Sequence, residues 1–119
     1  MEKPCLCKNI PPKQIDAIRK AEPDRQKVER LGDFFKVFGD PTRLRLLYYL
    51  ARNEFCVADL SSLVGMQQSA VSHQLKILRL HRLVRFRKEG VTTYYALDDR
   101  HVQEVFDLAL EHICEAESR

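Results

Sequence analysis

Two histidines and two carboxylates near the end of the chain have the side-chain types that bind divalent metals. These residues are Asp99, His101, His112 and Glu115. Two imidazoles and two carboxylates around one ion suit zinc, with cobalt as a laboratory substitute. The alternative is a helix that carries scattered surface histidines and acids. The residue types alone leave both interpretations open.

The spacing of these residues limits how they could act together. We expect a helix over 99–117, in which His101 and His112 are about 16 Å apart at a rise of ~1.5 Å per residue. They cannot share an ion within one chain, but the separation is close to three turns, so both project from the same face. If two copies of the helix pair antiparallel, the start of one meets the end of the other and two equivalent sites form. Asp99 and His101 then converge only if Asp99 lies at or before the helix N-cap.

Four cysteines are the other residues with binding or redox chemistry: Cys5, Cys7, Cys56 and Cys114. Residues 1–4 lack the apolar segment of a signal peptide, and no run approaches the length of a membrane span. We therefore expect a cytoplasmic protein without membrane contact, in which metal or redox chemistry is favoured over structural disulfides. We expect Cys114 to pack in a core or an interface rather than to bind metal.

Residues 57–83 contain two short helical patterns that meet at Gly65, where a left-handed turn is cheap for glycine. Each pattern has one apolar face. The apolar residues are Val57, Leu60, Leu63 and Val64 in the first pattern, and Val71, Leu75, Leu78 and Leu83 in the second. The outer face of the second pattern is polar and cationic. This is the layout with which a helix-turn-helix enters the major groove of DNA.

The residues after these two helices predict a β-hairpin. Residues 83–88 alternate apolar and basic side chains, Glu89-Gly90 makes a turn, and residues 92–97 are rich in β-branched and aromatic types. A hairpin that follows a recognition helix is a wing, whose basic tip can lie along the adjacent DNA backbone or minor groove. The motif is therefore a winged helix-turn-helix.

The charge distribution supports a nucleic-acid surface, although the net charge of +3 is mild. Six cations and no acid lie between Lys76 and Lys88, whereas acids dominate from Asp98 onward. A localised basic block is either a phosphate-facing surface or a solvated face. The candidate DNA contacts are Gln68, Ser69, Ser72, His73, Gln74 and Lys76 on the recognition helix, and Arg85, Arg87 and Lys88 on the wing.

The rest of the chain predicts a mainly helical fold. A length of 119 residues fits one DNA-binding and dimerisation domain over 25–119, preceded by an N-terminal arm over 1–24 with a short helix at 13–20. Asp40-Pro41 marks the start of a helix that runs to about residue 52. On the helix over 25–39 we expect a buried side made of Val28, Leu31, Phe34, Phe35 and Phe38. The broad apolar surface of the terminal helix indicates burial against a partner subunit, and hence a homodimer.

Five stretches in combination resemble the ArsR/SmtB family of metal-responsive transcriptional repressors, specifically its zinc- and cadmium-sensing branch. The stretches are DPTRLRLL at 40–47, FCVADL at 55–60, SAVSHQLKIL at 69–78, LVRFRKEG at 83–90 and YYALDDRH at 94–101. The resemblance implies a homodimeric winged helix-turn-helix protein, mainly α with a β-hairpin. It also implies that the protein binds operator DNA without metal and releases the DNA when metal binds.

The resemblance also bears on two candidate metal sites. The four terminal-helix residues all match the C-terminal-helix site of the family, which implies an intersubunit zinc site. Relatives with an N-terminal arm bind cadmium, lead or zinc through thiolates, which implies an arm site of Cys5, Cys7 and Cys56, perhaps joined by Asp59. Many cadmium and lead sensors carry a second cysteine where this chain has Ala58, so a four-thiolate site is absent here. The alternative is Cys56 as a small buried apolar residue beside a mobile arm.

The sequence therefore predicts a metal-responsive repressor, with two alternatives. One is a redox-responsive repressor of the same fold that uses Cys5, Cys7 and Cys56, and the other is a metal-buffering protein without operator binding. No nucleophile–base pair or phosphate loop is present, so we do not expect an enzyme. Relatives usually carry Ser or Thr where this chain has Gln67, so we expect either Ser69 to share the N-cap role or a looser first turn of the recognition helix.

Overall fold

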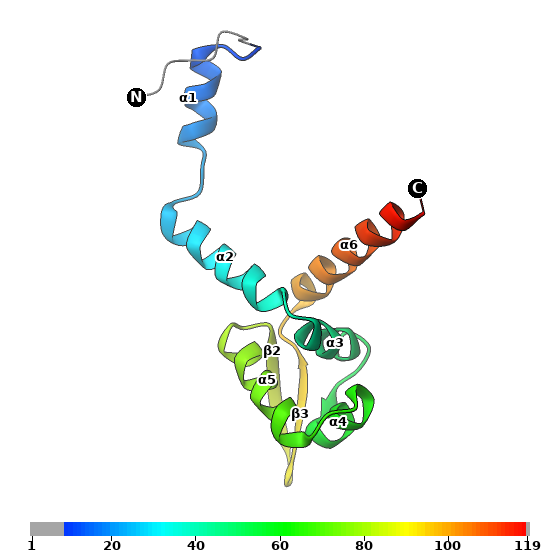
Figure 1. The fold of residues 1–119 in the computed structure, drawn as a ribbon. Helices are drawn as coiled ribbons and strands as arrows, with labels where there is room; N and C mark the ends of the chain where they lie inside the picture. The colour runs from blue at the N-terminus through cyan, green and yellow to red at the C-terminus, as the bar shows by residue number, and fades with distance from the viewer. Residues whose placement is uncertain (1–8, 119) are drawn as a thin grey trace. The chain divides into compact units, whose positions relative to one another are not determined.

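The computed structural model describes residues 9–118. Its helices and strands follow one another in the order α1, α2, α3, β1, α4, α5, β2, β3 and α6 (Figure 1). The chain divides into two compact units after Gly32, so each unit is described by itself. None of the helices in residues 9–118 has the length and apolar character needed to span a membrane.

The first unit contains α1 (Pro12–Lys20) and the first half of α2 (Arg25–Phe38). Pro12 begins α1, because its fixed φ suits the first helical position. The predicted buried side of α2 is wrong at three positions: Val28, Leu31 and Phe35 are exposed. The physical reason is that only the C-terminal end of α2 reaches the hydrophobic core described in residues 9–118: Val37 and Phe38 are buried in it, and Phe34 packs against it.

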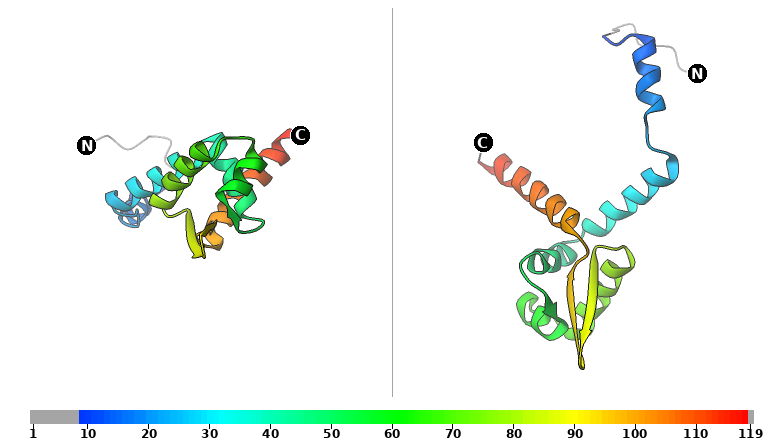
Figure 2. Two further views of the ribbon diagram at one scale, coloured as in Figure 1. Left: turned by 90° about the horizontal axis from the view of Figure 1, so that it is seen from below. Right: turned by 180° about the vertical axis from the view of Figure 1, so that it is seen from behind.

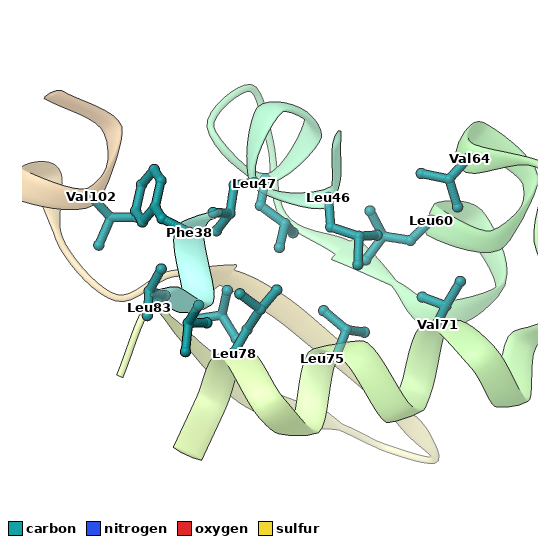
Figure 3. Close-up of a cluster of buried hydrophobic side chains, with 13 residues drawn as sticks. Phe38, Leu46, Leu47, Leu60, Val64, Val71, Leu75, Leu78, Leu83 and Val102 are labelled. Atoms are coloured by element: carbon teal, nitrogen blue, oxygen red, sulfur yellow. The ribbon is translucent and has the colours of Figure 1, made fainter. Parts of the chain in front are cut away.

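The core of the second unit lies between α3 (Pro41–Leu50), α4 (Val57–Val64) and α5 (Gln68–Leu80). Figure 3 shows leucines from α3 and α5 pointing toward one another, with Val102 and Phe38 closing one end. Asp40 caps α3 as predicted, because its carboxylate accepts the backbone N–H of Arg43 at 3.0 Å. The helix ends at Leu50, slightly before the predicted end.

The turn between α4 and α5 has the predicted left-handed glycine, since Gly65 has a φ of 70°. Burial of Val71, Leu75, Leu78 and Leu83 is confirmed. Leu63 is instead exposed, which corrects the predicted apolar face of α4. At about 100° per residue, Leu63 lies at the edge of the stripe formed by Leu60 and Val64.

The wing is part of a three-stranded antiparallel sheet with strand order β1-β3-β2. The predicted hairpin is confirmed as β2 (Val84–Glu89) and β3 (Thr92–Leu97), joined by a two-residue turn at Gly90-Val91. Gly90 has a φ of 62°, as the first central residue of a tight hairpin turn often requires. A short strand β1 (Phe55–Cys56), which the sequence did not predict, pairs with β3 and places it at the centre of the sheet.

The last element is α6 (Arg100–Glu117), and Asp99 is its N-cap. The carboxylate of Asp99 accepts a hydrogen bond from the backbone N–H of Val102 at 3.3 Å. Asp99 thus has the N-cap position that was predicted to be necessary for its side chain to approach that of His101. Val102 is the one buried residue of this helix. The C-terminal half of α6 projects away from the helix-turn-helix of the second unit in Figure 1 and Figure 2.

Candidate functional site

The outer face of α5 carries the predicted DNA-facing residues. Five of them are exposed: Gln68, Ser69, Ser72, His73 and Lys76. The opposite face, formed by Val71, Leu75 and Leu78, is fully buried. Because the buried face holds the helix against the core, the exposed side chains form a polar surface of fixed orientation that can read base edges in a major groove.

The first turn of α5 lacks a side-chain cap. Gln67 occupies the N-cap position and makes no side-chain hydrogen bond to the helix, although its carbonyl accepts the N–H of Val71 at 3.1 Å. The first-turn N–H groups are therefore free to bind phosphate oxygens. Of the two expected alternatives, the absence of a side-chain cap favours the looser turn.

Gln74 differs from the other predicted contacts because it is half-buried. Its Oε1 accepts a hydrogen bond from Nη1 of Arg43 at 3.4 Å, while Nε of Arg43 donates to the carbonyl of Val37 at 2.7 Å. Arg43 thus joins the end of α2, the start of α3 and the middle of the recognition helix. Gln74 therefore has a structural partner besides any DNA contact.

The three predicted cations of the wing have different surroundings. Arg85 and Lys88 are exposed and form no ion pair within residues 9–118. Arg87 pairs with Glu54 at 3.0 Å and with Glu89 at 2.8 Å. The tip itself is formed by Gly90 and Val91, so the positive charge lies along β2 and not at the end of the wing.

The start of α6 brings two of the four predicted metal ligands together. Nδ1 of His101 lies 3.5 Å from Oδ1 of Asp99, and both side chains are exposed. Partial desolvation of the Asp99 carboxylate acts to raise its pKa. Hydrogen bonds from the Val102 N–H and from His101 have the larger combined effect, so the pKa of Asp99 is lowered. The carboxylate is therefore ionised at neutral pH, as a metal ligand requires.

The other two predicted ligands lie on the last turns of the same helix. His112 and Glu115 are exposed and are three residues apart, so they occupy neighbouring positions on one face. Within the described part of the chain, no three His, Cys, Asp or Glu side chains gather closely enough to hold a metal ion. The donor types fit zinc, but a single copy of α6 offers a pair at each end and not a complete set.

The arm site is described only in part. Cys5 and Cys7 lie outside the described residues, whereas Cys56 is half-buried at the N-cap of α4 and Asp59 is exposed in its first turn. Cys114 is exposed on α6. Cys114 packs in no core formed by residues 9–118, because no element described there covers this part of α6, and the other half of the expectation, packing in an interface, stays a prediction.

Two residues that position the site, Arg43 and Glu54, were missed from the sequence, as was the backbone conformation of Arg82. Arg82 follows α5 with a φ of 60°, a left-handed conformation that is unfavourable for a residue with a Cβ. Glu54 and Arg43 act through partners 33 and 31 residues away, which no local pattern reveals. The change from helix to strand at 80–84 was the one local signal that could have pointed to Arg82.

Comparisons with known proteins agree with this architecture. The family model for the bacterial regulatory protein, arsR family, matches residues 40–85. A transcriptional repressor SmtB homolog from Synechocystis sp. is 39% identical over 106 residues, which cover 87% of this chain and 80% of the relative. A cadmium resistance transcriptional regulatory protein CadC homolog from Staphylococcus aureus is 32% identical over 100 residues, which cover 82% of this chain and 83% of the relative.

A solved structure shows the same fold. The homodimeric winged helix-turn-helix DNA-binding domain from Mycobacterium bovis superposes with a TM-score of 0.72 at 27% identity, covering 80% of this chain and 90% of that one. The predicted fold class is thus confirmed, and so is the expectation that the chain is not an enzyme, because the family consists of transcriptional regulators. The chain belongs to the ArsR family of DNA-binding transcriptional regulators.

Proposed function

We propose that the protein is a homodimeric repressor whose operator affinity falls when zinc binds between the two α6 helices. The observation that carries this proposal is the division of donors on α6. Asp99 and His101 lie at its start, His112 and Glu115 lie on its last turns, and the two pairs are too far apart to share an ion within one helix. Zinc, when bound, would supply a cross-link between subunits.

The apolar surface of α6 supports pairing with a second copy. Leu108, Leu110 and Ile113 are exposed, although side chains of this kind bury well. A groove of about 410 Å³ runs beside them, lined by Phe38, Leu44, Arg45, Tyr48, Tyr49, Phe106, Ala109, Leu110 and Ile113. An exposed apolar surface of this extent is typical of a protein–protein interface. Antiparallel pairing across it brings the start of one α6 to the end of the other.

The start of α6 is linked to the recognition helix by two backbone hydrogen bonds. The N–H of Asp98 donates to the carbonyl of Leu83 at 3.0 Å, and the N–H of Leu83 donates to the carbonyl of Leu78 in α5 at 2.9 Å. A displacement of Asp99 or His101 would therefore be transmitted through Asp98 and Leu83 to the C-terminal end of α5. Operator release follows if the metal-bound dimer spaces its two α5 helices in a way that fits adjacent half-sites poorly.

The DNA contacts divide into two kinds. Polar groups of α5, chiefly Ser69, Ser72 and His73, read base edges, whereas Arg85 and Lys88 meet phosphates beside the wing. Phosphate contacts set the position of the protein on the duplex, and base contacts set its sequence preference. Gln68, Gln74 and Lys76 complete the surface of the recognition helix.

The arm site is a second metal centre for cadmium or lead, formed by Cys5, Cys7 and Cys56 with Asp59. Its support is the half-buried Cys56 at the start of α4, with Asp59 one turn further on, and the similarity to a relative named for cadmium resistance. Thiolates favour these soft ions over the harder ones. This site would act on the helix-turn-helix through α4 instead of α6.

Fluorescence anisotropy tests the proposal, with a labelled duplex that the metal-free protein has selected from a random-sequence library. Zinc should weaken binding by about 5- to 150-fold, the usual range for coupling between two sites. The double variant His101→Ala/His112→Ala should bind DNA normally and lose this response. His81→Ala, at the exposed end of α5, serves as the matched control and should keep the response.

The other outcomes distinguish the alternatives. Zinc-induced release by the histidine double variant would place the zinc switch elsewhere. A cadmium or lead response that is unchanged in Cys56→Ser would remove the arm site. Release by peroxide that a chelator does not affect would indicate the redox-responsive repressor, and zinc binding without any DNA affinity would indicate metal buffering.

A further inference from the structure

We infer that Arg87 is a positioning residue that fixes the wing to the body of the domain through Glu54, and that it is not a phosphate contact. This role differs from that of Arg85 and Lys88, although all three cations lie on the same strand. The inference rests on the hydrogen bonds of the guanidinium group, on the local charge and on the position of Glu54 in the sheet.

The guanidinium group of Arg87 has a partner at each of its three nitrogens. Nε lies 3.0 Å from Oε2 of Glu54, Nη2 lies 3.2 Å from Oε1 of the same carboxylate, and Nη1 lies 2.8 Å from Oε2 of Glu89. Its carbon lies 4.7 Å from the centre of the Tyr94 ring. The bidentate pair with Glu54 and the stacking on the ring define one orientation of the side chain.

The charge around Arg87 disfavours a DNA phosphate. Two carboxylates surround one guanidinium, so these three groups by themselves carry a net charge of about −1, and Arg85 is a nearby cation that also acts on Glu54. The hydrogen bond from Arg87 lowers the pKa of Glu54, and the hydrogen bonds that Arg87 donates to Glu54 and Glu89 raise the pKa of Arg87, so the Glu54 carboxylate and the guanidinium are both ionised at neutral pH. A phosphate at this position would have to displace a carboxylate or lie beside it.

The pair also spans the whole sheet. Glu54 directly precedes β1, Arg87 lies on β2, and Tyr94 on the central strand β3 is paired with Cys56 on one side and with Arg87 on the other. The ion pair thus crosses over β3 and ties the outer strand of the wing to the segment that leads into α4. It holds the wing at a fixed angle to the helix-turn-helix before DNA binds.

The salt dependence of DNA binding separates positioning from phosphate contact. For metal-free protein on the selected duplex, loss of one phosphate contact should reduce the slope of log K against log salt by about 0.9. We expect this reduction for Arg85→Ala. Arg87→Ala should weaken binding by about threefold to tenfold, through loss of a partly exposed bidentate pair, with an unchanged slope.

Changing the partner of Arg87 gives the second test. Glu54→Gln should weaken binding as Arg87→Ala does, and the double variant should be no weaker than either single variant, because both changes break the same link. Arg87→Lys keeps the charge but not the bidentate geometry, so it should not restore binding. Glu111→Gln, an exposed acid of α6 without an ion pair in residues 9–118, controls for the loss of one negative charge.

Two results would overturn the inference. One is a slope for Arg87→Ala that falls as it does for Arg85→Ala. The other is tighter binding by Glu54→Gln, which is the result expected if Glu54 only competes with phosphate for Arg87. Circular dichroism confirms that each variant is folded, and Glu54→Gln and Arg87→Lys carry the test if Arg87→Ala does not fold.

Discussion

The helices α5 and α6 are both amphipathic, but among the described residues the apolar face of α5 is covered far more completely than that of α6. In α5, three of 13 residues are buried, and Leu75 and Leu78 have no exposed surface. In α6, one of 18 residues is buried, while Leu108 is 66% exposed and Ile113 is 55% exposed. The difference indicates that the apolar face of α5 is buried within its own chain, whereas the apolar face of α6 is suited to burial against a second copy.

The same contrast holds for the two functional surfaces. The DNA-facing side chains of α5 share one helix face and are already oriented by the core behind them. The proposed ligands of α6 are divided between the two ends of the helix. Substitutions at four positions, with controls at Leu80, test this contrast, and they follow in order of decreasing expected effect.

Leu75→Ala should lower the free energy of unfolding by about 3 kcal/mol, because it leaves a cavity in the core of a single chain. Urea denaturation measures the loss, which should be the same at every protein concentration above that needed for dimerisation. Leu80→Ala, on the exposed side of the same helix, should change the free energy by less than about 0.5 kcal/mol. Equal losses in the two variants would contradict the assignment of α5 to the core.

Leu110→Glu should separate the dimer into folded monomers, since it places a charge in the apolar surface of α6. Sedimentation velocity at micromolar concentration measures the change, and circular dichroism checks the fold. Leu80→Glu introduces the same charge on α5 and should leave the dimer intact. A dimeric Leu110→Glu variant would show that the subunits pair through another surface.

Asp99→Asn and Asp99→Ala separate capping of α6 from metal binding. Asn is as good an N-cap as Asp, so Asp99→Asn should keep the melting temperature of the metal-free protein and lose zinc affinity. Asp99→Ala should lose zinc affinity and also lower the melting temperature by a few degrees. Isothermal titration calorimetry with zinc and thermal unfolding measure the two effects. Normal zinc affinity in both variants would remove Asp99 from the ligand set.

The pKa of Asp99 adds a pH dependence to this comparison. Because its pKa is lowered in the folded state, the stabilisation from its ionised form is complete above the unfolded value of about 3.9. It is lost as the pH falls from there through the folded-state pKa. The stability of the native protein relative to Asp99→Asn should therefore fall as the pH is lowered below about 4.

Arg82→Gly should raise the free energy of unfolding slightly, by about 0.5 kcal/mol. Relief of the left-handed conformation at a φ of 60° outweighs the greater flexibility of glycine in the unfolded chain. Urea denaturation measures the gain. A loss of stability would mean that contacts of the Arg82 side chain outweigh the backbone strain, and that the end of α5 depends on them.

The sequence predicted those parts of the fold that follow from local patterns. The spacing of Val71, Leu75 and Leu78 defined the inner face of α5, and Asp40 and Gly65 marked a helix start and a helix end. In each case the determinant is local: side-chain periodicity, capping or a positive φ acts within one or two helical turns. Such features can be predicted from the sequence without a structure.

The features that escaped prediction depend on segments distant in sequence. The strand β1 has two residues, too few for a periodic pattern, and forms only because β3 offers free backbone groups. The Arg87–Glu54 pair joins residues 33 positions apart. Phe35 and Leu63 have core-type side chains but are exposed, because no element within residues 9–118 covers them. For the candidate metal site, the sequence supplied the residue types and the N-cap role of Asp99, while on the proposed arrangement a second molecule supplies the rest of the site.

The division of donors along α6 would make the metal response depend on how many copies of the regulator a cell contains. On the proposed arrangement, each ion is held by two molecules, so the apparent zinc affinity falls at concentrations where the dimer dissociates. A dilute sample would then underestimate the affinity of the intact sensor. A cell that changes the abundance of this protein would thereby also shift the zinc level at which its operator is released.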